Sequence, residues 1–203
     1  IEKPSDIITK QAAAAVGQCE LMYTYDRLFG QYNHTVAQIL LTGDDVEDPD
    51  RAEHLRSTFS ALLELGCIPV VNENDSVSSA EIETGKCKVL GDNDTLSAIV
   101  ARLCSASLLV LLSDIDGLYN ADPHQNPNAQ LIKRVEEITP ELRAMAGGAG
   151  TWRGTGGMAT KLMAAKTAMD AGIDMVITNG ANMEALYDIV EGKPVGTRFC
   201  AKR

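Results

Sequence analysis

Four short segments of the sequence are dominated by valine, isoleucine and leucine, and stretches with helical character separate them. They cover Val36–Leu41, Cys67–Val71, Ser107–Leu112 and Asp174–Thr178. A strand that is apolar at consecutive positions is buried on both faces, which is typical of parallel sheets with helices on either side. The pattern therefore predicts an α/β fold with a mainly parallel sheet.

Helices are predicted around these strands from apolar residues near helical spacing and from capping residues. The expected helices run from Asp6 to about Gly30, from Asp48 to Gly66, from Asp94 to Leu103, from Thr139 to Ala146, from Met158 to Ala171 and from Asn182 to Val190. The first is expected to face the core. Alternating pieces predict a hairpin excursion over Val77–Leu90, and a last extended piece is expected near Val195–Phe199.

Length and composition narrow the class of protein further. The 203 residues favour one domain, since domains average roughly 150 residues. A net charge of -10 argues against a nucleic-acid backbone as the main partner. The longest strongly apolar stretch, Leu108–Leu112, is far shorter than the roughly 20 residues that span a bilayer, so no membrane segment is expected. The 5 scattered cysteines predict neither a zinc site nor disulfides and fit a reducing cytoplasm.

Polar residues follow three of the predicted strands, at Asn72–Asp75, at Ser113 and Asp114, and at Thr178–Gly180. Ligands of open parallel sheets bind at the carboxyl ends of the strands. We therefore expect these three groups to face one crevice. The competing interpretation is that strand ends are loops and loops are polar, which is sufficient for any one group taken alone.

The segment Gly154–Lys161 predicts a cradle for a phosphate group. Gly156 and Gly157 let the backbone approach a ligand closely, and the helix that begins near Met158 directs its free N–H groups at the loop. Lys161 lies about one turn into that helix, and helical side chains tilt toward the N-terminus, so its ammonium group can reach the same anion. The alternative is a flexible loop followed by a solvated lysine.

A second polar stretch, Gly91–Asp94, enters another predicted helix. One aspartate or asparagine there is explained by N-capping alone. Three consecutive polar side chains exceed that need, so the stretch is either a cap or part of a site. If Asp92 is the cap, Asn93 and Asp94 are left to face the crevice.

Taken in order, several stretches resemble the glutamate 5-kinases of the amino acid kinase superfamily. These are Lys10–Gln18, Asn72–Asp75, Gly91–Asp94, Ser113–Tyr119 with Asp122 and Pro123, and Gly154–Lys161. The resemblance runs over nearly the whole chain and implies a three-layer αβα sandwich, with residues 1–203 forming an amino acid kinase domain. It also implies ATP-dependent phosphorylation of the γ-carboxylate of L-glutamate to γ-glutamyl phosphate, the first step of proline biosynthesis.

The resemblance also implies residue roles. Asp75 and Asn93 match glutamate-binding positions. Lys161 matches the lysine that stabilises the transferring phosphoryl group, and Asp94 matches the aspartate that organises the catalytic lysines. The nucleotide contacts match Ser113, Asp114, Thr155, Gly156, Gly157, Met158, Ala159, Thr160 and Lys161. Mg²⁺ is expected with ATP, and no residue is assigned as a metal ligand; no general base is needed because a γ-carboxylate with a pKa of about 4.3 is already ionised.

Two elements of the family pattern do not occur in these residues. Family members open with a strand leading into a Lys-x-Gly-Thr/Ser loop and a second strand ending in Ser-Gly-Ala, and this chain contains neither pattern. Some family members also carry a C-terminal PUA domain, and the stretches that resemble the family here do not include one. Two alternatives stay open: a sister kinase acting on N-acetylglutamate, aspartate, carbamate or UMP, and a non-catalytic module that binds nucleotide or amino acid.

Further partners are implied by the resemblance alone. Proline is expected as a feedback inhibitor, and the labile acyl phosphate is expected to pass to a γ-glutamyl phosphate reductase. Family members usually form homo-oligomers, so an oligomer is expected here. The expected location is the cytoplasm.

Overall fold

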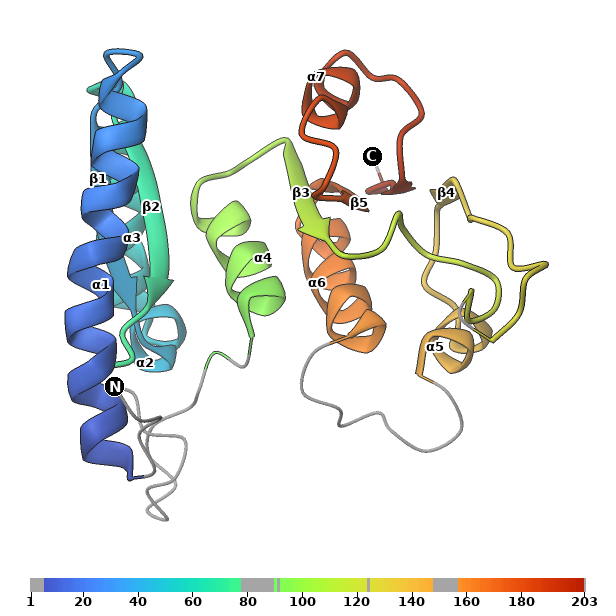
Figure 1. The fold of residues 1–203 in the computed structure, drawn as a ribbon, viewed down its shortest axis with the longest axis horizontal. Coiled ribbons are helices and arrows are strands. Elements are labelled where there is room, and N and C mark those ends of the chain that lie inside the picture. The colour runs from blue at the N-terminus through green and yellow to red at the C-terminus, as the bar shows by residue number, and fades with distance from the viewer. Residues whose placement is uncertain (1–5, 78–89, 91, 124, 148–156, 203) are drawn as a thin grey trace. The chain divides into compact units, whose positions relative to one another are not determined.

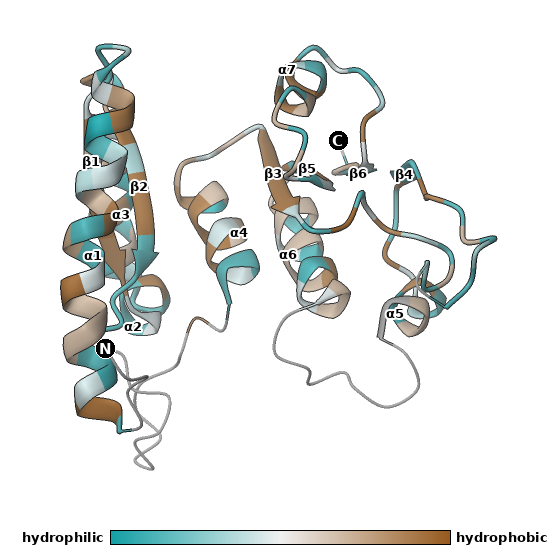
Figure 2. Ribbon diagram, viewed as in Figure 1, coloured by the Kyte–Doolittle hydropathy of each residue, from teal (hydrophilic) through white to brown (hydrophobic). Residues whose placement is uncertain are grey.

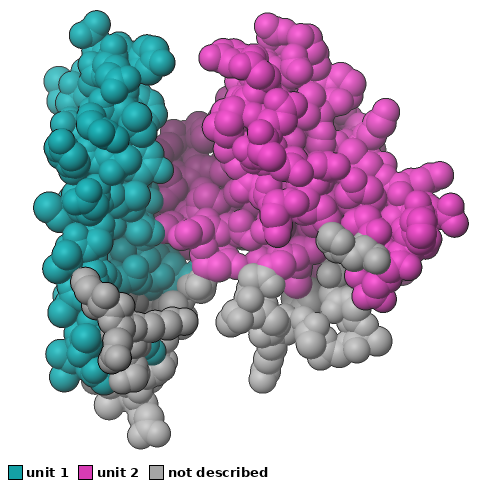
Figure 3. Space-filling view, viewed as in Figure 1, with its two compact units in different colours: residues 1–90 teal, residues 91–203 magenta. Residues whose placement is uncertain are grey.

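The chain forms two compact units, residues 1–90 (unit 1) and residues 91–203 (unit 2), as Figure 3 shows. The structure is a computed structural model that describes residues 6–77, 90, 92–123, 125–147 and 157–202. The hairpin excursion predicted over Val77–Leu90 lies, apart from its two end residues, outside the described residues. The assignment of residues 1–203 to one kinase domain stays a prediction.

Unit 1 is built on a two-stranded parallel sheet. Its elements are α1 (Ile7–Gly30), β1 (Val36–Leu41), α2 (Gly43–Glu47), α3 (Pro49–Glu64) and β2 (Ile68–Glu73). The register places Val36 opposite Ile68 and Leu41 opposite Glu73, so both strands end at the same edge. In Figure 1, α1 lies in front of this sheet and α3 behind it, which agrees with a sheet covered on both faces.

The start of α3 follows the sequence prediction. The Asp48 side chain accepts hydrogen bonds from the backbone N–H groups of Asp50 and Arg51, both at 3.0 Å, and Pro49 occupies the first helical position. A proline there costs nothing because that N–H has no partner inside a helix. From this start the helix buries Ala52 and Phe59.

The helix α1 packs against β1 but is less buried than its sequence predicts. None of its 24 residues is buried, and Ile8 and Val16 are 75% and 74% exposed. Figure 2 shows apolar and polar residues mixed along its visible side. Two strands about 5 Å apart give a sheet too narrow to cover apolar residues spread around a helix. The expectation of a core-facing helix is therefore wrong for this unit.

Unit 2 contains a four-stranded sheet in the order β3-β5-β6-β4. Its elements are α4 (Asn93–Leu103), β3 (Leu108–Ser113), β4 (Arg134–Val135), α5 (Pro140–Gly147), α6 (Met158–Asp170), β5 (Asp174–Asn179), α7 (Ala185–Val190) and β6 (Thr197–Phe199). The pairs β3–β5 and β4–β6 are parallel, whereas β5 and β6 are antiparallel. The prediction of an α/β fold with mainly parallel strands is confirmed.

The strand β6 runs antiparallel to β5. The connection between them, residues 180–196, contains one short helix, α7. The chain re-enters the sheet from the end at which β5 left it, so Thr197 pairs with Ile177 and Phe199 with Met175.

The core of unit 2 lies between this sheet and the helices. Among its most deeply buried residues are Met175 and Ile177 of β5, Phe199 of β6, and small residues of α4 and α6. Figure 2 shows β3 as an apolar strand along its length. None of the helices in the described part of the chain combines the length and the apolar character that a membrane span requires.

Candidate active site

Lys161 and Asp94 form an ion pair in unit 2, 67 residues apart in the sequence. The Lys161 Nζ lies 3.0 Å from the Asp94 Oδ2, and the two side chains are only 15% and 18% exposed. The Thr160 hydroxyl lies 3.0 Å from the same carboxylate oxygen. The two residues predicted as catalytic are thus brought together, and Asp94 fixes the lysine ammonium in one place.

The first turn of α4 explains where Asp94 stands. Asp92 is the N-cap, and its Oδ1 accepts the Thr95 N–H at 2.9 Å, so the prediction that Asp92 caps the helix is confirmed. Asn93 and Asp94 then occupy the first two helical positions, where the helix dipole stabilises a negative charge. Asn93 is exposed, and Asp94 turns toward α6. The Asp92 Oδ2 is buried without a hydrogen-bond partner among the described residues.

The first turn of α6 presents the predicted phosphate cradle. Its N-cap is Gly157, with φ 137°, a backbone conformation that residues with a side chain rarely adopt. No side chain caps this end, so the N–H groups of the first helical residues, Met158, Ala159 and Thr160, have no capping partner in the described residues. Thr155 and Gly156, also predicted nucleotide contacts, lie outside the described residues.

Small residues bring α4 and α6 close enough for the ion pair. Ala98 and Ala101 follow Asp94 by four and seven positions, and Ala165 and Ala168 follow Lys161 by the same intervals. Residues at these spacings share one face of a helix. All four alanines belong to one buried cluster, with exposures from 0% to 6%. This repeated spacing in the sequence, polar residue followed by alanines, is a signal that the sequence analysis missed.

A second group of predicted residues lies where β3 ends. The Ser113 hydroxyl donates to the Asp114 Oδ1 at 3.1 Å, and Asp114 is exposed. Ser113 pairs with Asn179 at the end of β5, so two of the three predicted strand ends do meet. The Gly180 N–H donates to the Ser113 carbonyl at 2.8 Å and joins the loops that follow the two strands.

The third strand end belongs to unit 1. β2 ends at Glu73, and Asp75 follows at an exposed position. Partial loss of solvation raises the pKa of the Asp75 carboxyl above its ordinary value of 3.8, and the nearby Glu73 charge adds to the effect. Asp75 and Asn93, the two predicted glutamate contacts, lie in different units.

Gln18 of α1 is a polar residue at this end of unit 1 that the sequence analysis did not single out as a site residue. Its Oε1 accepts from the Asn72 side-chain amide at 3.4 Å, and its Nε2 is buried with no partner among the described residues. Gln18, Glu73 and Asp75 line the same small hollow. Its position within the motif Lys10–Gln18 was the only signal available in the sequence.

No cluster of three or more acidic, histidine or cysteine side chains in the described ranges could hold a metal ion. Mg²⁺ commonly binds through one or two carboxylates together with substrate phosphates. Asp114 offers an exposed carboxylate beside a hydroxyl, which suits that mode of binding.

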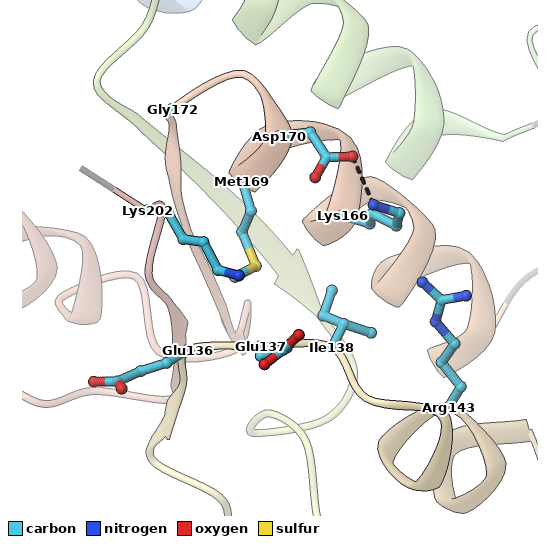
Figure 4. Close-up of a pocket in the computed structure, with 9 residues that line it drawn as sticks. All are labelled: Glu136, Glu137, Ile138, Arg143, Lys166, Met169, Asp170, Gly172 and Lys202. Atoms are coloured by element: carbon cyan, nitrogen blue, oxygen red, sulfur yellow. Dashed lines mark hydrogen bonds and ion pairs between the residues drawn. The ribbon is translucent and has the colours of Figure 1, made fainter.

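A separate groove of about 490 Å³ lies at the other end of α6. Figure 4 shows Lys166 and Asp170, paired at 2.7 Å, with Arg143 and Lys202 among its walls. Asp170 is nine residues beyond Lys161, about 14 Å along the helix axis. The groove is therefore not part of the Lys161 site, although it is larger than the hollow beside Asp75.

Comparison with known proteins decides the family. The sequence model of the amino acid kinase family matches residues 2–179. The chain belongs to the amino acid kinase family. The glutamate 5-kinase of Clostridium perfringens (strain 13 / Type A) is 53% identical over 202 residues, covering 100% of this chain and 74% of the relative. That of Clostridium tetani (strain Massachusetts / E88) is 54% identical over 200 residues, covering 98% and 73%.

Solved structures of two other kinases share the fold at low sequence identity. The UMP kinase from Bacillus anthracis has a TM-score of 0.58 at 16% identity and covers 97% of this chain and 66% of its own. The T. acidophilum isopentenyl phosphate kinase product complex has a TM-score of 0.53 at 17% identity, with 83% and 61% covered. At such identities the likeness establishes the fold of an amino acid kinase and not the substrate.

Proposed function

We propose that the protein is a glutamate 5-kinase, which transfers the γ-phosphoryl group of ATP to the γ-carboxylate of L-glutamate. The observation that carries the proposal is the 3.0 Å pair of Lys161 and Asp94 beside the start of α6, which no side chain in the described part of the chain caps. The family membership supports ATP as the donor, and relatives at about 50% identity that bear the name glutamate 5-kinase support glutamate as the acceptor.

The reaction needs alignment and charge neutralisation more than proton transfer. A γ-carboxylate oxygen of glutamate attacks the γ-phosphorus of ATP, the bond from that phosphorus to the β,γ-bridging oxygen breaks, and ADP leaves. Because the attacking carboxylate is already ionised, no side chain has to remove a proton. This accounts for a site built from lysine, aspartate and backbone N–H groups.

Lys161 is assigned to the transferring phosphoryl group. Its ammonium offsets the negative charge of the phosphoryl oxygens, and Asp94 and the first turn of α6 hold it in place. The N–H groups of Met158, Ala159 and Thr160 are assigned to the phosphates, with Gly157 permitting a close approach. Bound Mg²⁺ would supply further positive charge beside the phosphates, with Asp114 as its candidate protein ligand.

Asp75 is assigned to the α-ammonium group of glutamate, and Asn93 to a hydrogen bond with the same substrate. A carboxylate that pairs with a free ammonium favours glutamate over N-acetylglutamate, whose nitrogen is uncharged. Ser113 and Asp114 are assigned to the nucleotide. The same proposal includes four further properties. These are location in the cytoplasm, inhibition by proline, transfer of the product to a reductase and a homo-oligomeric state.

The test is an assay of γ-glutamyl phosphate by hydroxylamine trapping, with the protein in its full natural length, ATP, Mg²⁺ and glutamate. We expect γ-glutamyl hydroxamate with glutamate. ADP release, measured in parallel because it reports phosphoryl transfer to any acceptor, is expected to stay at background with N-acetylglutamate, aspartate, carbamate or UMP in place of glutamate. Lys161→Met is expected to lower kcat by about 10²- to 10³-fold, the usual cost of one lost transition-state contact.

The matched control is Lys166→Met, the same substitution on the same helix at a lysine paired with Asp170. It is expected to leave kcat unchanged. Full activity in Lys161→Met, or no hydroxamate from the unsubstituted protein, would contradict the assignment.

A further inference from the structure

The loop after β3 and the loop after β5 are joined by side chains that the assigned nucleotide contacts do not include. The Asn179 Nδ2 donates to the Asp116 Oδ1 at 2.8 Å, and the Asn179 Oδ1 accepts the Ala181 N–H at 2.9 Å. The other Asp116 oxygen, Oδ2, accepts the Tyr119 hydroxyl at 3.2 Å. Asn179 therefore uses its amide as donor and acceptor at once, and Asp116 uses both of its oxygens.

This network surrounds the turn that begins at Ser113. The Ser113 carbonyl accepts the Gly180 N–H at 2.8 Å, next to Asn179 in the sequence. Asp116, three residues after Ser113, accepts a hydrogen bond from Asn179 at the end of β5. Beyond it, the Leu118 N–H donates at 2.8 Å to the fully buried Thr197 hydroxyl. Asp114 thus lies between two attachment points to the end of β5, at Ser113 and Asp116, and Leu118 adds a third attachment, to β6.

The charges of the network also favour a specific residue at position 179. The Asp116 carboxylate needs a donor, and the Ala181 N–H needs an acceptor, so only a side chain with both functions satisfies the two neighbours. An aspartate at 179 would keep the acceptor but place a second negative charge against Asp116. Hydrogen bonds to an ionised group are among the stronger ones in proteins.

We propose that Asn179 and Asp116 are positioning residues that hold the Ser113–Asp114 turn in the conformation that contacts the nucleotide. The proposal rests on the assignment of Ser113 and Asp114 to the nucleotide under the proposed function. It predicts that breaking the Asn179–Asp116 bond affects the use of ATP and leaves the use of glutamate unaffected.

The test measures KM for ATP, KM for glutamate and kcat in four forms of the full-length protein. Asn179→Asp is expected to raise KM for ATP about tenfold, the size of one lost hydrogen bond to a charged group, with KM for glutamate unchanged. Asp116→Asn is expected to have a small effect, because its carbonyl oxygen still accepts from Asn179 and its amide can donate to the Tyr119 oxygen.

The double variant Asn179→Asp with Asp116→Asn exchanges donor and acceptor and restores the bond in the opposite direction. It is expected to return KM for ATP to within about twofold of the starting value, since the opposed charges are gone and the bond is remade. The matched control is Asn182→Asp, which adds the same charge to the same loop at an exposed residue outside the network. It is expected to leave KM for ATP unchanged.

A merely structural role would lower the unfolding temperature of Asn179→Asp and leave its KM for ATP unchanged, which would overturn the proposal. Should that variant fail to fold, Asn179→Ser keeps an acceptor for Ala181 without the reach to Asp116, and the same rise in KM for ATP is expected. Ser113→Ala and Asp114→Asn test the nucleotide contact separately from the positioning role. If neither variant changes KM for ATP, the assignment of Ser113 and Asp114 to the nucleotide fails. If they change KM for ATP and Asn179→Asp does not, only the positioning role fails.

Discussion

At the scale of single residues, the role proposed for Asp75 predicts that glutamate binding depends on pH. Loss of solvation, reinforced by the Glu73 charge, raises the pKa of its carboxyl above 3.8, so it takes up a proton at a higher pH than an ordinary aspartate. The protonated form is neutral and cannot pair with the α-ammonium of glutamate. Affinity for glutamate is therefore expected to fall as the pH is lowered, beginning above the range in which ordinary aspartates titrate.

The measurement is KM for glutamate between about pH 4.5 and pH 8, with ATP saturating. Asp75→Asn is expected to raise KM about tenfold to a hundredfold at neutral pH and to remove the additional loss on acidification. Glu73→Gln is expected to move that loss to lower pH, because a neighbouring negative charge is removed. The γ-carboxylate of glutamate titrates equally in all three proteins, so equal pH profiles would rule out the assigned role of Asp75.

The local positions of site residues could be predicted where they follow from spacing along one helix. Asp92 as a cap and Lys161 one turn into α6 follow from spacing along one helix, and both were predicted. The partner of Lys161 was suggested only by the resemblance, because helical spacing relates residues three or four apart and Asp94 lies 67 residues away. The same limit applies to Asn179 and Asp116, whose contact depends on the pairing of β3 with β5.

At the scale of elements, continuous apolar runs predicted the strands β1, β2, β3 and β5 close to their observed bounds. The two-residue strand β4 and the five-residue helix α2 were not predicted, because so few residues show no periodicity. The direction of β6 was also not predicted. It depends on the path of the chain through residues 180–196, which no periodic pattern in the sequence determines.

The short return from α7 to β6 is expected to depend on Gly196. This residue has a φ of 64°, and a Cβ there would collide with the Ile177 carbonyl oxygen of β5. Gly196→Ala is therefore expected to lower the free energy of unfolding by about 2–4 kcal/mol, combining backbone strain with the displacement of a buried strand.

Gly192→Ala is the matched control for Gly196→Ala. Gly192 has a similar φ of 79°, but a Cβ there meets nothing within 4 Å. It is expected to cost only the strain of the backbone conformation, about 1 kcal/mol. Urea unfolding followed by circular dichroism gives both values, and equal losses in the two variants would show that the collision at Gly196 is relieved without cost.

At the scale of the whole molecule, an acidic chain binds two anionic substrates by concentrating positive potential locally. The net charge is -10, yet the proposed phosphate cradle combines Lys161 with a helix N-terminus that no side chain caps among the described residues. Local potential near a ligand decides binding more than net charge does, because solvent and salt screen distant charges over about 10 Å. Of the residues proposed to contact glutamate, Asp75 is in unit 1 and Asn93 is in unit 2, and the residues proposed to contact the phosphates are in unit 2.

This division predicts that each substrate protects a different set of backbone amides from hydrogen exchange. A non-hydrolysable ATP analogue is expected to slow exchange in the first turn of α6 and in the segments after β3 and β5, because the nucleotide orders those loops. Glutamate alone is expected to slow exchange in residues 72–76 and at the start of α4. Lys161→Met should weaken the first effect, and Asp75→Asn should abolish the protection of residues 72–76. Mass spectrometry of peptic fragments measures both, and protection of residues 72–76 by the nucleotide analogue alone would contradict the assignment of separate contacts to the two units.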